Sequence, residues 1–260
     1  MGTPFTAFLG PSDLSAYDHT KPPSVQSSEV PKTFLDAMEV REQVFVKEQG
    51  IPPENEFDSD DPRSCHWVIY ASVNTVVSAE ECDAAGNITK PKESTTRSTP
   101  IGTIRLVPFP HFPHPQPGSK FVFSPEVAAA EPPSYIVDRA TTFHDGIEPY
   151  LKLGRIAVIK EFRGSGLAKI LAGAAMNWAR GDPTFFNPSV AEVGMENLLA
   201  ESIEAVPAWK GLMCVHAQEQ VEKTWAKWGF EIDEAMGKWE EEGIMHVGMF
   251  QRLKLDEQSP

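Results

Sequence analysis

Apolar and polar residues alternate over several short stretches of this chain, a pattern that is typical of β-strands. The clearest stretch covers residues 151–159. Other stretches are rich in β-branched and aromatic residues, which favour a pleated surface. We therefore predict further strands at 66–72, 100–107, 212–216, 230–232 and 244–253.

The segment after residue 166 has the period of a helix with one buried face. Its apolar residues recur at i, i+3, i+4, i+7 and i+11, and Gly181-Asp182-Pro183 ends the pattern. A helix is also predicted near the carboxyl end, where Gly229 fits the C′ position. The positions predicted to face inward are Leu167, Ile170, Leu171, Ala174 and Trp178 in the first helix, and Val221, Trp225 and Trp228 in the second.

Residues 34–49 predict a third helix, which the sequence Gly50-Ile51-Pro52-Pro53 must end. We expect its apolar side chains to lie inward, namely Phe34, Leu35, Met38 and Phe45. Residues 1–31 hold several Pro and Ser and show no apolar period, so they are predicted to form a flexible arm. One domain is then expected over residues 32–256.

Three insertions are predicted within this domain, near 83–99, 108–149 and 182–209. Prolines recur through 108–118 and cannot pair in a sheet, so that segment predicts an extended loop near the mouth of the binding site. Residues 191–203 predict a short helix. We expect the histidines of the 108–149 insertion to be solvated, namely His111, His114 and His144.

Composition narrows the class of protein. With 260 residues and 41% hydrophobic content, the chain can bury one core, and no stretch of 18 apolar residues predicts a membrane span. The three cysteines, Cys65, Cys82 and Cys214, show no paired spacing and follow no secretory signal, so we expect a cytoplasmic protein without a metal site. A net charge of −14 argues against nucleic acid and favours cationic partners.

The stretch Arg163-Gly164-Ser165-Gly166-Leu167-Ala168 joins the predicted strand to the predicted helix. Glycines let the backbone approach a bulky anion, and the N–H groups of the first helical turn point at it. The alternative is a loop that only packs a strand tightly against a helix. The P-loop and Rossmann patterns do not fit, because neither Gly-Lys-Ser/Thr nor Gly-x-Gly-x-x-Gly with a later acidic residue is present.

The loop Arg-Gly-x-Gly-x-Ala resembles the pyrophosphate-binding pattern Gln/Arg-x-x-Gly-x-Gly/Ala of the GNAT superfamily of N-acetyltransferases. Two further segments resemble its ElaA-like branch: Val44 to Gln49 with Asp58 to Asp61 and His66, and Trp228 to Met249. The resemblance covers about residues 34–82, 100–108 and 150–253 in order. It implies a single α/β domain, in which a mixed central sheet with splayed strands is flanked by helices.

The resemblance implies an acetyl-CoA-dependent N-acetyltransferase, in which the amine of a small cationic acceptor attacks the thioester directly. The acidic segments 54–61 and 231–242 would attract this acceptor. Val158 would offer its amide to the thioester oxygen. The residues implied to bind acetyl-CoA are Ile156, Ala157, Val158, Arg163, Gly164, Ser165, Gly166, Leu167 and Ala168.

One position departs from the family. Trp225 stands where the family has a tyrosine that protonates the leaving thiolate, and an indole cannot donate a proton as a phenol does. The acid or base must then come from the acceptor side, and His216 ranks first because its strand lies beside the thioester. The candidates are His216, His66, Glu48, His246 and Glu241.

Several alternatives stay open from the sequence. The chain can be an acyltransferase for another acyl group or acceptor, or an acyl-CoA-binding module without catalysis. Cys214 can in principle be acylated, although strand cysteines are mostly small buried hydrophobes. A homodimer is left open, and Gly2 matches the loose myristoylation pattern, which we interpret as a chance match.

Overall fold

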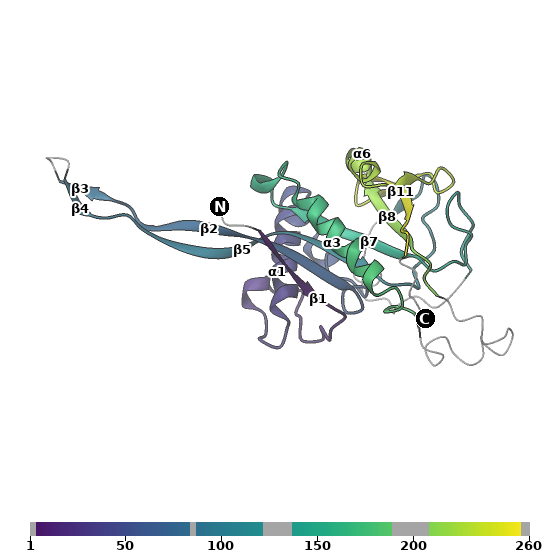
Figure 1. The fold of residues 1–260 in the computed structure, drawn as a ribbon, viewed down its shortest axis with the longest axis horizontal. Coiled ribbons are helices and arrows are strands. Elements are labelled where there is room, and N and C mark those ends of the chain that lie inside the picture. The colour runs from purple at the N-terminus through teal and green to yellow at the C-terminus, as the bar shows by residue number, and fades with distance from the viewer. Residues whose placement is uncertain (1–3, 84–86, 122–136, 189–207, 256–260) are drawn as a thin grey trace.

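A mixed sheet runs through the whole molecule in the computed structural model, which describes residues 4–83, 87–121, 137–188 and 208–255 (Figure 1). Its strand order is β1-β2-β5-β7-β8-β11-β10-β6, with β9 paired to β11. The β7/β8 and β10/β6 pairs are parallel and the others antiparallel. The strands are β1 Phe5–Leu9, β2 Cys65–Ser78, β5 Glu93–Val107, β6 Lys120–Phe121, β7 Leu151–Val158, β8 Leu212–Gln218, β9 Glu231–Ile232, β10 Lys238–Glu241 and β11 Ile244–Arg252.

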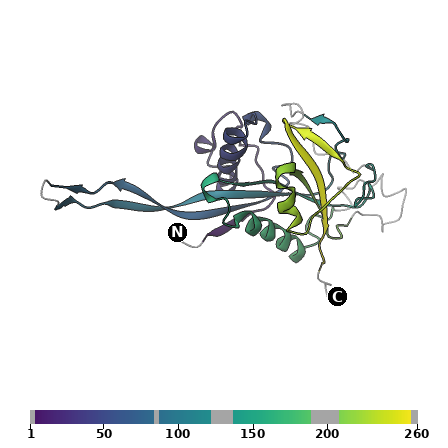
Figure 2. The same cartoon turned by 90° about the horizontal axis from the view of Figure 1, so that it is seen from above.

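Two helices cover opposite faces of this sheet (Figure 2). The first is α1 (Lys32–Arg41), which continues as a π-helical segment, Glu42–Glu48. The second is α3 (Leu167–Gly181), and a short helix, α6 (Glu222–Ala226), follows β8. The predicted α/β class and its mixed sheet flanked by helices are confirmed. Single-turn 3-10 segments lie at Pro23–Val25, Pro53–Asn55, Lys160–Phe162 and Glu219–Val221.

Helix α3 packs against β5 at very short range. A Cβ atom on Gly102 would lie 3.0 Å from the Ala157 carbonyl oxygen and 3.1 Å from Leu171 Cδ1, so only glycine fits there without displacement. The buried face of α3 differs in part from the prediction, because Ile170 is 47% exposed. The helix is rotated so that small residues lie against the strands; its buried residues are Leu167, Leu171, Ala172, Ala175, Met176 and Ala179.

The other two predicted helices are confirmed in place; the first changes from α-helix to π-helix after Arg41 and ends at Glu48, and the second is a short helix, Glu222–Ala226. Val221 is 36% exposed and lies before α6, whereas Trp225 is buried as predicted. Gly229 has a φ of 96°, the left-handed conformation expected at a C′ position. In α1, Phe34 and Met38 are buried as predicted.

Strands β7 and β8 separate soon after they begin. They pair only at Leu151↔Met213, Lys152↔Cys214 and Leu153↔Val215, although β7 continues to Val158 and β8 to Gln218. On its other side β7 stays paired with β5 as far as Val158. The predicted splayed strands are therefore confirmed, and one edge of β7 is open where the gap begins.

The prediction of a flexible arm over residues 1–31 is wrong for the described part. Residues 5–9 form the edge strand β1, whose partners in β2 run from Tyr70 to His66. Leu14 and Val30 are buried against Phe34 and Met38. These apolar residues are too widely spaced to give a period, and their burial depends on α1 lying beside them. Gly2, and any modification of it, lies outside the described residues.

The insertion predicted near 83–99 is the outer part of a long two-stranded hairpin that extends from the sheet (Figure 1). Strands β2 and β5 pair from Cys65↔Leu106 to Ser78↔Glu93, with register shifts after Ile69 and Val76, so residues 93–99 of this insertion are strand. The short strands β3 (Glu81–Cys82) and β4 (Ile88–Lys90) pair farther out. The helix predicted at 191–203 lies outside the described residues.

The 108–118 segment forms the predicted extended loop, with a single turn near its end, but its histidines are not solvated. His111, His114 and His144 are all buried, and their rings pack on the buried ring of Tyr150 at 4.2–5.5 Å. Their loops fold back over the sheet and cover Tyr150 and Phe250. The proline content predicted the extended backbone correctly, but it does not indicate which surface that backbone covers. Within the described ranges, we find no helix of the length and hydropathy that crossing a membrane requires.

Candidate active site

A cavity of about 910 Å³ opens where β7 and β8 part. One wall is β7 from Lys152 to Val158, and the opposite wall is the end of β8 together with α6. The loop at 112–116 and the β10–β11 turn close one end, while the π-helical segment after α1 and the glycine loop bound the other. The tip of the splayed gap is thus a deep site between two rigid strands.

The glycine loop lies at the start of α3 with its backbone accessible. Gly164 and Gly166 have φ values of 79° and 82°, and a Cβ at either position would meet no atom within 4 Å. The N–H groups of residues 164–167 make no hydrogen bond within the described chain, and no side chain caps the helix. Unpaired donors at a helix start, in open space, suit a bulky anion.

Arg163 ties this loop to the end of β7. Its Nε donates to the Val158 carbonyl oxygen at 2.8 Å, and its Nη2 pairs with Glu48 at 2.7 Å. Glu48 therefore lies at the glycine-loop end of the cavity and is engaged with Arg163. The structure does not bring Glu48 to His216, His246 and Glu241, so the acid-base role considered for it is not supported.

The open edge of β7 presents main-chain donors to the gap. Ile159 N–H donates to the Ile101 carbonyl oxygen of the β5 side at 2.9 Å. Because successive N–H groups of a strand point to opposite sides, those of Val158 and Ile156 point toward the gap. A bulge precedes them, since the register shifts between Thr103 and Arg105 and Arg155 has a φ of 49°.

Three of the five candidate acid-base residues come together on the acceptor side of the cavity. His216 Nδ1 lies 3.5 Å from Glu241 Oε1, and His246 Nε2 lies 4.0 Å from Glu241 Oε2. The Trp239 indole also donates to Glu241 at 2.6 Å. His216 Nε2 is buried and has no hydrogen-bond partner among the described residues. We call His216, Glu241 and His246 the acceptor-side cluster.

Burial keeps His216 neutral at physiological pH. Burial lowers the pKa of His216 below its ordinary value, and it outweighs the hydrogen bond to Glu241, which favours the imidazolium. Burial works against ionisation of Glu241, but hydrogen bonds from His216 and the Trp239 indole favour the carboxylate and lower the pKa of Glu241. His216 is thus a free base whose Nδ1 side is oriented by a carboxylate.

His66 is not part of the site. It lies in β2, is 1% exposed, and its Nε2 is 2.9 Å from the Asp61 carbonyl oxygen. Burial lowers its pKa to about 4. Its ring packs edge-on against Phe34. Cys214 is also a buried core residue, whose thiol pKa burial raises, as its interpretation as a small hydrophobe predicted.

A buried charge network forms the floor of the cavity, and the sequence analysis missed it. Arg41 and Arg105 both contact Asp61 Oδ1 at 2.7 Å. Arg105 also holds Asp58 at 2.6 Å. Arg155, at the bulge, reaches Glu56 at 2.9 Å and Asp58 at 3.1 Å. The three arginines come from α1, β5 and β7, so no local pattern places them together.

This network changes the interpretation of the acidic segment 54–61. Glu56, Asp58 and Asp61 are matched by three arginines, and Asp60 is paired with Arg63 at 2.7 Å. Little uncompensated negative charge therefore remains on this side. Two further carboxylates, Glu241 and Glu242, line the cavity from the β10–β11 side.

Trp225 lines the cavity from α6. It is 3% exposed, and its ring packs edge-on against Trp228 at 4.9 Å and Phe230 at 5.1 Å. The position where the family has its tyrosine thus faces the same cavity, and an indole occupies it.

No family model matches the chain, and no curated protein matches it. Solved structures do resemble it. A putative N-acetyltransferase from Lactobacillus plantarum is 17% identical, with 97% of this chain and 100% of that chain covered and a TM-score of 0.49. An acyl-CoA N-acyltransferase from Pseudomonas aeruginosa is 14% identical, with 96% of this chain and 99% of that chain covered and a TM-score of 0.45. Escherichia coli ElaA is 13% identical, with 96% of this chain and 100% of that chain covered and a TM-score of 0.45. At these identities the likeness concerns the fold.

Proposed function

We propose that this chain is a GNAT-type N-acyltransferase that binds acetyl-CoA along the gap between β7 and β8. One observation carries the proposal: the open edge of β7 leads directly to the N–H groups of the glycine loop. An extended pantetheine arm can pair with Ile156 and Val158 as an added strand would. The pyrophosphate then meets the donors at 164–167.

The acceptor-side cluster supplies proton transfer for this reaction. An amine must be neutral to attack a thioester, and the buried Nε2 of His216 is a neutral base that can take its proton. Glu241, on the Nδ1 side, then stabilises the imidazolium and acts as a positioning residue. The Val158 N–H stabilises the oxygen of the tetrahedral intermediate as charge develops on it.

The acceptor that fits this cavity is a small cationic amine. Glu241 and Glu242 line the acceptor side, and the chain carries a net charge of −14. Both features raise the local concentration of cations. Release of free CoA over a panel of amines tests the proposal, and comparing acetyl-CoA with longer acyl-CoA esters tests the acyl group. Acyl-CoA binding without CoA release for any amine would favour the non-catalytic binding module instead.

His216→Gln is expected to lower kcat by about ten-fold or more, with little change in acetyl-CoA binding, because a positioned base typically contributes 10²–10⁴-fold. In the wild-type protein, kcat/KM should fall as pH drops through the pKa of His216, which lies below its ordinary value of about 6.5. The His216→Gln variant should not show this fall of kcat/KM at low pH. Steady-state kinetics from about pH 5 to 9 measure both effects.

The matched control is His19→Gln, which changes an exposed histidine that does not line the cavity. It should keep the wild-type rate and pH profile. A His216→Gln protein with wild-type kcat and an unaltered profile would make His216 structural and transfer the proton-transfer role to His246.

Trp225→Tyr is expected to raise kcat by about two- to ten-fold, since a phenol at this position can protonate the leaving thiolate. The ring becomes smaller and keeps its aromatic neighbours, so the fold should persist. Turnover is measured beside the circular dichroism spectrum. A well-folded variant with a sharply reduced rate would show that the indole itself shapes the site.

A further inference from the structure

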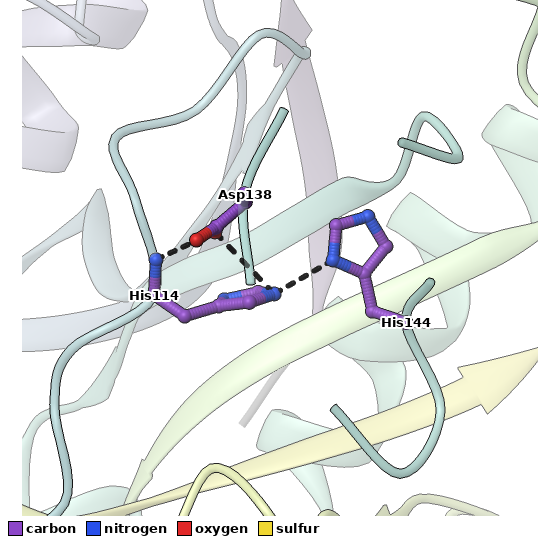
Figure 3. A group of neighbouring side chains, drawn as sticks. All are labelled: His114, Asp138 and His144. Atoms are coloured by element: carbon purple, nitrogen blue, oxygen red, sulfur yellow. Dashed lines mark hydrogen bonds and ion pairs between the residues drawn. The ribbon is translucent and has the colours of Figure 1, made fainter. Parts of the chain in front are cut away.

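Two loops meet at a group of ligand-type side chains outside the acceptor-side cluster, in which His114 and His144 are buried and Asp138 is half-buried (Figure 3). His114 comes from the 108–121 loop, and Asp138 and His144 come from the segment after residue 136. His114 Nε2 lies 2.8 Å from His144 Nδ1 and 3.8 Å from Asp138 Oδ2. Within the described residues, this is the group of three whose ligand atoms all lie within 4.8 Å of one another.

The spacing is close to that of a tetrahedral metal site. Zinc bonds of about 2.0–2.1 Å to nitrogen and oxygen place neighbouring ligand atoms roughly 3.3 Å apart. The two separations at His114 Nε2 lie on either side of this value. Shifts of about half an ångström would bring these two separations to the tetrahedral value, and the third separation, between His144 and Asp138, lies within 4.8 Å. Two imidazoles and one carboxylate are a donor set that zinc prefers.

Hydrogen bonds to main-chain groups orient two of the three ligands, His144 and Asp138, while the Nδ1 of His114 is buried without a hydrogen-bond partner among the described residues. His144 Nε2 lies 2.9 Å from the Glu148 carbonyl oxygen, which fixes the proton on Nε2 and leaves the Nδ1 lone pair toward His114. The two oxygens of Asp138 accept main-chain N–H groups of His114 and Arg139, both at 2.7 Å. Two acceptor atoms thus face a single His114 Nε2, which can donate only one proton.

The surroundings suit a bound ion as well. The rings of Tyr150 and Phe250 pack around His114 and His144 and exclude bulk water. A small cavity of about 60 Å³, lined by Asp138 and His144, adjoins the group and has room for a water as fourth ligand. The carbonyl oxygen of Gly146 accepts a hydrogen bond from the Asp138 N–H at 2.8 Å. A Cβ atom on Gly146 would collide with the Asp138 carbonyl, so this close approach requires glycine.

We propose that His114, Asp138 and His144 form a zinc site that fastens the 108–121 loop to the 137–149 segment. The expectation from the cysteine pattern that the chain lacks a metal site would then be wrong, because this donor set uses no cysteine. Since residues 112–116 line the large cavity, the ion would also hold the acceptor side of that cavity in place.

The test uses the full chain, stripped of metal with a chelator and titrated with ZnCl₂ by calorimetry. One zinc ion per chain should bind and raise the melting temperature. Co²⁺ in place of zinc should give the visible absorption of a low-coordinate nitrogen and oxygen site. Asp138→Asn and His144→Ala should each weaken zinc binding by more than about 100-fold, as the loss of a direct ligand exceeds the 10–100-fold typical of outer-shell changes.

Two controls make the outcome specific. His19→Ala removes an exposed histidine, and His246→Gln changes the acceptor-side cluster; both should bind zinc as the wild-type protein does. Circular dichroism verifies the fold of each variant before titration. Absence of zinc binding to the wild-type chain would overturn the proposal, as would undiminished binding to folded Asp138→Asn. Loss of binding in His246→Gln alone would overturn it too, by placing the ion at the acceptor-side cluster.

Discussion

Gly166→Asp is expected to abolish the rise in melting temperature that acetyl-CoA gives the wild-type protein. The new carboxylate would lie beside the unpaired N–H groups at the start of α3, where the pyrophosphate is proposed to bind. The aspartate side chain adds bulk and a negative charge at a position where a bulky anion is proposed to bind. The shift is measured by thermal denaturation with and without millimolar acetyl-CoA, and calorimetry gives the affinity.

Gly166 has a φ of 82°, where any residue with a Cβ atom destabilises the fold by about 1 kcal/mol. The effect of this backbone strain on acetyl-CoA binding has to be separated from the effect of the new charge. Gly166→Ala carries the strain alone and should keep part of the affinity. Gly118→Asp places the same side chain at a φ of 74°, in the loop at the opposite end of the cavity, and should respond to acetyl-CoA like the wild type. Unchanged stabilisation of Gly166→Asp by acetyl-CoA would remove the basis of the proposed function.

Asp61→Asn is expected to lower the free energy of unfolding by about 3–5 kcal/mol, the usual cost of leaving a buried charge uncompensated. Asp61 has no exposed side-chain surface and holds both Arg41 and Arg105 at 2.7 Å. An amide keeps the shape and loses the charge, so two buried guanidinium groups would share fewer counter-charges. Urea denaturation at pH 7 measures the difference.

The same variant should change how stability depends on pH. Burial works against ionisation of Asp61, but Arg105 and Arg41 outweigh it and hold the pKa of this carboxyl below its unfolded value of about 3.9. Its contribution is therefore present above that value and is lost as pH falls toward the folded pKa. Glu56 acts in the opposite direction, because burial raises its pKa. The difference between the wild-type and Asp61→Asn curves isolates the Asp61 contribution.

Asp18→Asn is the matched control for this stability experiment. Asp18 pairs with Lys21 at 2.8 Å, but both side chains are exposed, so solvent screening leaves this pair little effect on stability. Equal losses in Asp18→Asn and Asp61→Asn would contradict the argument that burial decides the cost.

The sequence predicted the parts of this protein that depend on local pattern. The alternation of apolar and polar residues predicted the position of β7. The glycine loop after it was correctly predicted to join a strand to a helix. Positive φ at Gly164 and Gly166 follows from the need for a tight turn, which only the local residues decide. The binding residues that the family resemblance implied stay a prediction.

Prediction was wrong where burial depends on a partner far away in the chain. Ile170 was placed on the buried face of α3, because period alone cannot say which of two adjacent stripes meets the sheet. His114 and His144 were expected to be solvated because they lie in a proline-rich insertion, yet this insertion covers Tyr150 and Phe250. Residues 5–9 form a strand only because β2 offers an edge.

The sequence by itself thus determined the order of the main strands and helices, the glycine turn between β7 and α3, and the unusual Trp225, since these are properties of neighbouring residues. Tertiary structure alone decided which charges cancel and which side chains meet. Arg41, Arg105 and Arg155 neutralise the acidic segment from three separate elements, and Glu241 joins His216 across two strands. Electrostatic interactions depend on distance in space, and the folded backbone sets those distances for residues that are remote in sequence.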